Sequence, residues 1–146
     1  MKAITLICVI TLALVANLAN AKDEKHMMLI ADAMNSPDYK TRLDPNVGLY
    51  FGDQKHADVI QSYGIYPTNK KTNAFNKGDR EACEWVMLSA LLTLQERAVK
   101  EGGNAVINIA SYYKKNTMKS DTQFECHIGT FVGGVALIGE VVKLDK

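Results

Sequence analysis

The residues of this chain best suited to redox or nucleophilic chemistry are its three cysteines, Cys8, Cys83 and Cys126. Cys8 lies in an apolar run near the N-terminus, which leaves Cys83 and Cys126 as a pair. Their spacing is neither the C-x-x-C of a redox centre nor a zinc-ligand pattern, so we expect a structural disulfide. Such a bridge closes a loop of about forty residues and contributes about 4 kcal/mol through chain entropy. A redox-active disulfide is the alternative.

Histidines and serines give weaker indications of chemistry. His26, His56 and His127 match no compact chelating motif, so we expect no metal site. No serine lies in the G-x-S-x-G context of a nucleophile elbow. The phosphate-binding pattern G-x-x-x-x-G-K-[ST] is missing from the sequence. The sequence therefore predicts no catalytic residues and no cofactor, and it favours a non-enzymatic role.

Two lysine-rich segments offer a binding surface instead. Residues 68–78 and 114–121 are polar and are predicted to be a surface loop and a turn. If they met at one end of a sheet, they would form a basic patch edged by aromatic rings, suited to an anionic glycan, a phosphate-bearing surface or an acidic partner. The alternative is two solvated loops. The candidate binding residues are Lys70, Lys71, Lys77, Tyr112, Tyr113, Lys114 and Lys115.

The N-terminus carries the three parts of a secretory signal over residues 1–21. Lys2 supplies the positive charge, an apolar run follows, and Ala19 and Ala21 stand where signal peptidase requires small residues. The apolar run is shorter than the ~20 residues of a membrane span. We therefore expect an exported, soluble chain that starts at Lys22, without a transmembrane segment, in the periplasm or the medium.

The charge of this mature chain is balanced. Removing Lys2 from the 17 Lys and Arg leaves 16, which equals the 16 Asp and Glu. A neutral chain argues against a nucleic-acid partner held by phosphate contacts. The partner is expected to be an unidentified protein or an envelope or host surface.

The clearest predicted element is a long amphipathic helix that begins at an N-cap, Asp79, and stops at Gly102-Gly103. Apolar residues recur at spacings of three and four along it, at Ala82, Cys83, Val86, Met87, Ala90, Leu91, Leu94 and Ala98. The opposite polar face is predicted to carry Glu84, Gln95, Glu96 and Lys100.

Segments rich in β-branched and aromatic residues predict the sheet. The expected strands cover residues 47–51, 59–66, 104–113, 122–128 and 135–144. Packing the helix on one face of this largely antiparallel sheet gives a small α+β fold with one disulfide. The glycine-rich residues 129–134 are expected to connect the last two strands. Residues 22–46 are expected to be an N-terminal extension, and residues 47–146 the domain.

The end of the helix and the last strand carry a resemblance to known proteins. The run Gly103-Asn104-Ala105-Val106 after the helix, with the closing strand from Gly134 to Val142, resembles the YbjQ-type family. It also resembles the core of the Rcs envelope-stress sensor lipoprotein. The resemblance implies a YbjQ-like domain, and the ring-forming relatives of that family leave homo-oligomerisation open.

The whole mature chain is also similar to a group of small exported proteobacterial proteins. The common stretches are residues 51–56, 68–77 and 111–116. That group often bears the label excinuclease ATPase subunit, which the residues contradict because the chain has neither a phosphate-binding loop nor zinc-ligand cysteine pairs. A shared fold by itself does not give the function.

Together these observations predict an exported, non-enzymatic interaction module that is envelope-associated or secreted. One alternative is a binding protein for a small ligand or an anionic glycan, which would use the lysine and tyrosine loops. The other is a protein with a redox-active disulfide.

Overall fold

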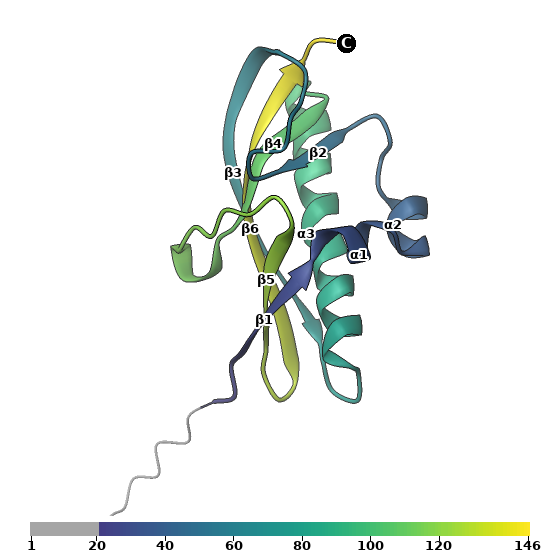
Figure 1. Cartoon of the computed structure of the whole chain (residues 1–146), viewed down its shortest axis with the longest axis vertical. Coiled ribbons are helices and arrows are strands. Elements are labelled where there is room, and N and C mark those ends of the chain that lie inside the picture. The colour runs from purple at the N-terminus through teal and green to yellow at the C-terminus, as the bar shows by residue number, and fades with distance from the viewer. Residues whose placement is uncertain (1–20) are drawn as a thin grey trace, which may run out of the picture.

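The computed structural model describes residues 21–146, which form an α+β fold in which one long helix packs against a curled sheet (Figure 1). The helix is α3 (Asp79–Glu101), and the sheet has six strands. All strand pairs are antiparallel except β2 with β4. None of the helices within residues 21–146 combines the length and the apolar character that crossing a bilayer requires. The signal peptide expected over residues 1–21 lies, apart from Ala21, outside the described residues.

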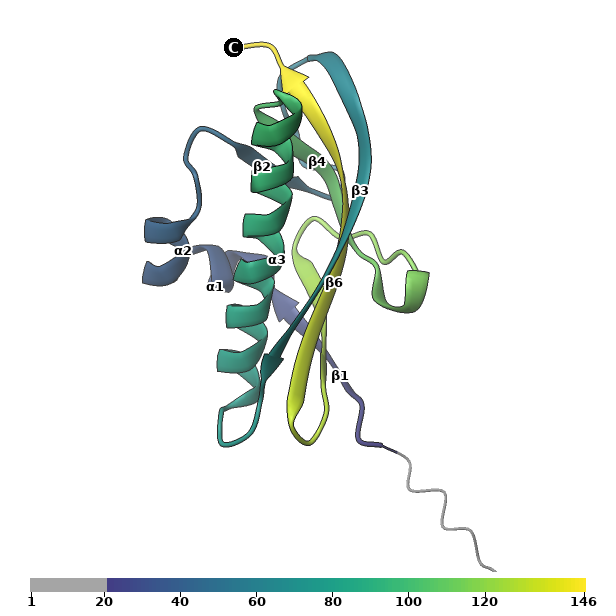
Figure 2. The ribbon, with the colours of Figure 1, turned by 180° about the vertical axis from the view of Figure 1, so that it is seen from behind.

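The last strand, β6 (Val132–Leu144), is the centre of the sheet. The long strand β3 (Val59–Asn73) pairs with β6 along one side. On the other side, β5 (Gln123–Ile128) pairs with the start of β6 and β4 (Ala105–Ser111) pairs with its second half. The helix α3 covers one face of this arrangement, and we call the opposite face the outer face (Figure 2).

Two further strands complete the sheet. β1 (Glu24–Leu29) pairs with β5, and β2 (Gly48–Phe51) pairs with β4. Between β1 and β2 in the sequence come the short helices α1 (Ile30–Met34) and α2 (Pro37–Arg42), which lie beside α3 (Figure 1). The segment expected as an N-terminal extension thus adds an edge strand and two short helices to the fold.

The polar segment 68–78 was predicted to be a surface loop, but its first half belongs to a strand. β3 continues to Asn73, which pairs with Val132 at the start of β6. Its polar residues are compatible with a strand because β3 is at the edge of the sheet and exposes alternate side chains. The predicted glycine connection is shortened in the same way, since β6 already includes Gly133 and Gly134. A Cβ on Gly133 would lie only 2.9 Å from Ile128 Cδ1, so glycine fits this close approach.

The long helix is confirmed, but its expected division into one apolar and one polar face is not shown. Its N-cap is Gly78 rather than Asp79, which is the first helical residue. At about 100° per residue, the buried residues of α3 cover more than half of its circumference. The sheet buries one side, while α2 and the segment before β2 bury another. Gln95, predicted on the polar face, is therefore only 3% exposed.

The predicted disulfide is confirmed. Cys83 in the first turns of α3 is bonded to Cys126 in β5, across 43 positions of sequence. Both residues are 0% exposed. The bond therefore links the helix to the sheet inside the core.

Candidate functional site

Charged and aromatic side chains gather on the outer face, where four strands run side by side. The strand register places Lys71 of β3, Gly134 of β6, His127 of β5 and Lys25 of β1 in one row. Adjacent strands are about 4.8 Å apart, which puts the Cα atoms of Lys71 and His127, two strands apart, about 10 Å from each other. Gly134 has no side chain, so nothing projects between them.

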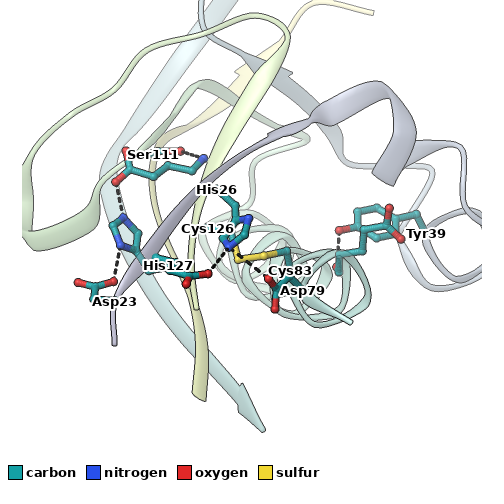
Figure 3. Close-up of a disulfide and its surroundings, with 11 residues drawn as sticks. Asp23, His26, Tyr39, Asp79, Cys83, Ser111, Cys126 and His127 are labelled. Atoms are coloured by element: carbon teal, nitrogen blue, oxygen red, sulfur yellow. Dashed lines mark hydrogen bonds and ion pairs between the residues drawn. A yellow bond between two sulfur atoms is a disulfide. The ribbon is translucent and has the colours of Figure 1, made fainter. Parts of the chain in front are cut away.

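His127 is the centre of this group. Its Nδ1 contacts Asp23 Oδ1 at 2.7 Å, and its Nε2 contacts Glu125 Oε1 at 2.5 Å. Figure 3 shows His127 directed toward Asp23. The ring of Tyr113 stacks on the imidazole, with centroids 3.4 Å apart and planes at 11°. We call these two rings the Tyr113–His127 platform.

The two carboxylates around His127 are paired with further donors. Asp23 accepts a hydrogen bond from the Tyr113 hydroxyl at 2.8 Å and lies 3.6 Å from Lys114 Nζ. The hydrogen bonds from Tyr113 and from His127 hold the pKa of Asp23 below its usual range. Glu125 lies 3.6 Å from Lys25 Nζ. Both carboxylates are thus committed to the network that holds the platform.

A strained turn presents the tyrosine. Tyr113 begins the 3₁₀ turn η1 (Tyr113–Lys115), in which Lys114 and Lys115 have φ angles of 49° and 63°. Residues other than glycine rarely adopt such backbone angles, and these angles persist where surrounding contacts fix them. Here the Tyr112 N–H donates to the carbonyl of Ala136 in β6 at 2.8 Å. The turn therefore projects Tyr113 and two exposed lysines from a fixed base.

The structure separates the seven predicted binding residues. Lys71 is on the outer face with the platform, and Lys114 and Lys115 are in η1 beside Tyr113. Lys70 faces the opposite way because it pairs with Val135 of the core. Tyr112 is half-buried at the end of β4.

The seventh of these residues, Lys77, precedes α3 and belongs to a different region. It lines a groove of about 660 Å³ between α2 and the first half of α3. Trp85, which is 41% exposed, and Tyr39 line the same groove. The Tyr39 hydroxyl donates to the carbonyl of Glu84 at 2.6 Å, and burial raises the pKa of this phenol. The two lysine segments therefore share a surface only in part.

Sequence reasoning missed Asp23 and Glu125 as members of the site. Asp23 lies 104 positions before His127. No local pattern links them, because the contact arises from the pairing of β1 with β5. Recognising Lys25, Met27 and Leu29 as alternate residues of an edge strand would have been the one available signal.

Replacing Tyr113 with Phe should raise the pKa of Asp23 toward its ordinary value of 3.8. The lost hydroxyl makes the largest contribution to lowering that pKa. Because the folded-state pKa is lowered, the stabilisation from Asp23 is present above the ordinary carboxyl range and is lost as pH falls through the folded-state value. In the variant, ionised Asp23 should contribute less to the free energy of unfolding, and this contribution should be lost at a higher pH than in the wild type. The carboxyl carbon shift of Asp23, followed by NMR against pH, measures the pKa directly. Tyr112→Phe is the control, and an unchanged Asp23 pKa in Tyr113→Phe would contradict the role given to this hydroxyl.

Comparison of the chain with models of protein families, with curated proteins and with solved structures found no match in any of the three.

Proposed function

We propose that this protein is an exported, non-enzymatic binding module whose outer face binds anionic groups on a partner or envelope surface. The observation that carries the proposal is the Tyr113–His127 platform, which a strained turn and two carboxylates hold in place. Its His127 lies in the same row as Lys71. A rigid aromatic surface beside cations is suited to recognition, because little ordering remains to be done on binding.

The charges of the outer face favour an anionic ligand. Lys71 and Lys115 are exposed, and neither forms an ion pair with another described residue. The neighbouring carboxylates, Asp23 and Glu125, already pair with His127 and with Lys114 or Lys25. The free charge offered to a ligand is therefore positive, and Tyr113 offers an aromatic ring beside it. This combination suits the carboxylates and ring faces of an acidic glycan.

The same contacts support binding rather than catalysis. Both ring nitrogens of His127 are paired with carboxylates, so neither is left to take a proton from a substrate. Cys83 and Cys126 are bonded to each other and are not available as nucleophiles. These chemically capable groups are used to hold the structure.

Export is supported by the signal-like N-terminus and by the disulfide, which is typical of oxidising compartments. The resemblance to YbjQ-type proteins and to the Rcs lipoprotein core rests on residues at the end of α3 and in β4 and β6, two strands at the centre of the sheet. We infer that the chain shares that core, with the outer face as its own specialisation.

Binding of defined polygalacturonate oligomers, with neutral dextran as the second probe, tests the proposal by calorimetry at low salt. We expect polygalacturonate to bind and dextran not to bind. Reversing two charges of the outer face, Lys71→Glu with Lys115→Glu, should weaken binding at least tenfold. Added salt should weaken it as well, because it screens exposed charges.

Two lysines elsewhere on the molecule are the matched controls. Lys77 lines the α2–α3 groove, and Lys100 lies in the last turn of α3; both are exposed. The double variant Lys77→Glu with Lys100→Glu changes the net charge by the same amount and should leave binding within about twofold of the wild type. Equal weakening by both double variants would show a net-charge effect and overturn the assignment of the outer face. Lack of binding by wild-type protein would overturn the choice of ligand class.

A further inference from the structure

The opposite face of β1 contributes to a second cluster, beside the disulfide. Glu24 and His26 point toward α3, since their partners in β5 are Ile128 and Cys126 of the core. Asp79, in the first turn of α3, meets them there. The ligand atoms of these three residues all lie within 4.8 Å of one another. Figure 3 shows His26 directed toward Asp79, with the disulfide next to it.

One imidazole nitrogen of His26 lies near two carboxylates but makes no hydrogen bond with a described residue. Nε2 is buried and makes no hydrogen bond with any described residue. Yet it lies 3.4 Å from Asp79 Oδ2 and 3.6 Å from Glu24 Oε2. A buried polar atom without a partner is costly, and a bound ion or water removes that cost. Here two carboxylate oxygens stand near it without forming that bond.

These separations fit atoms that share a metal ion. Zinc lies about 2.0–2.1 Å from histidine nitrogen and about 2.0–2.2 Å from carboxylate oxygen, in a tetrahedral arrangement. Tetrahedral ligands at such distances are about 3.4 Å from each other. The two distances from Nε2, 3.4 and 3.6 Å, match that spacing.

We propose that Glu24, His26 and Asp79 form a binding site for a zinc-class divalent cation. One imidazole and two carboxylates suit such an ion, and water would complete the tetrahedron. Lys22 Nζ lies 3.6 Å from Glu24 Oε1. It therefore contacts the carboxylate oxygen that does not face His26. The ion would join β1 to α3, four residues before Cys83, where the disulfide joins α3 to β5.

An ion bound on the helix side of β1 would also affect the outer face of that strand. Because side chains alternate along a strand, Asp23 and Lys25 lie on the outer face while Glu24 and His26 lie on the helix side. Fixing Glu24 and His26 would also fix the strand that carries Asp23 to His127. The metal site does not depend on the proposed binding function, since its test uses the metal alone.

Calorimetric titration of the disulfide-bonded protein with ZnCl₂ tests this site. We expect one zinc per chain, and a dissociation constant at least tenfold weaker in His26→Gln. Glu24→Gln and Asp79→Asn should each weaken binding, because they remove a charged ligand. His56→Gln is the matched control, since His56 is exposed on the loop before β3 and should leave affinity unchanged. The Cys83–Cys126 bond is verified by mass spectrometry in every sample, because free thiolates would bind zinc themselves.

Thermal unfolding provides a second readout that does not rely on heat of binding. Zinc should raise the Tm of the wild type and of His56→Gln, because a ligand that binds only the folded state stabilises it. It should raise the Tm of His26→Gln much less. Equal zinc affinity in wild type and His26→Gln would overturn the proposal, as would the lack of zinc binding by wild-type protein. If His26→Gln fails to fold, the conservative pair Glu24→Gln and Asp79→Asn decides: unchanged affinity in both overturns the site.

Discussion

Replacing Cys83 and Cys126 together with alanine should lower the free energy of unfolding by about 4 kcal/mol, because the bond closes a long loop of the unfolded chain. The lost bond joins α3 to β5 within one core. The unfolding transition should therefore remain a single step, with its midpoint at a lower urea concentration. Urea unfolding followed by far-UV circular dichroism measures it. Reducing the wild-type protein before the titration should give a loss of similar size.

The control for this prediction also tests the redox alternative. Both cysteines are 0% exposed, so a reductant reaches the bond only when the structure opens. We expect the bond to resist mild reductant in native protein and to be reduced rapidly in urea. Rapid reduction of the native protein would contradict a structural role and favour a redox role. A loss of stability below 1 kcal/mol would contradict the account of the joint.

Replacing Gln95 with leucine should cost about 3 kcal/mol, the second large effect. The Gln95 side chain is buried in α3 and makes three hydrogen bonds to the segment before β2. It accepts from the Asp44 N–H at 2.9 Å and donates to the carbonyls of Asp44 and Val47 at 3.0 and 2.8 Å. Leucine fills a similar space but leaves buried backbone groups without partners, each costing about 1–3 kcal/mol. Urea unfolding again measures the change.

The neighbouring residue provides the control. Glu96 is exposed on the same helix and makes no side-chain hydrogen bond or ion pair within the described residues. Glu96→Gln should change the free energy of unfolding by less than about 0.5 kcal/mol. Similar losses for Gln95→Leu and Glu96→Gln would show that the effect is a general one on the helix. Such a result would contradict the role of Gln95 in anchoring the segment before β2.

Local patterns were sufficient to predict the elements that have strong periodicity. The spacing of apolar residues predicted α3, and the dense β-branched residues of β4 and β6 predicted strands. The disulfide followed because only Cys83 and Cys126 remain in the domain. These features depend on neighbours in sequence or on a simple count.

Features set by contacts distant in sequence were not predictable. The polar end of β3 is a strand only because β6 pairs with it, and Gln95 is buried only because residues 44–47 cover that side of α3. Likewise, nothing near His127 in sequence indicates Asp23. The register of β1 with β5 joins them, and one residue of slip would place Asp23 on the helix side.

The most direct test of the binding surface is to record ¹H–¹⁵N NMR spectra of the protein during titration with polygalacturonate oligomers. We expect the largest shifts to fall on Lys71, Tyr113, Lys115 and His127. The indole N–H of Trp85, the one tryptophan of the chain, should stay unchanged, because it lies in the α2–α3 groove. Shifts centred on Trp85 and Lys77, with the Tyr113–His127 platform unaffected, would show that the ligand binds in the α2–α3 groove and not on the outer face.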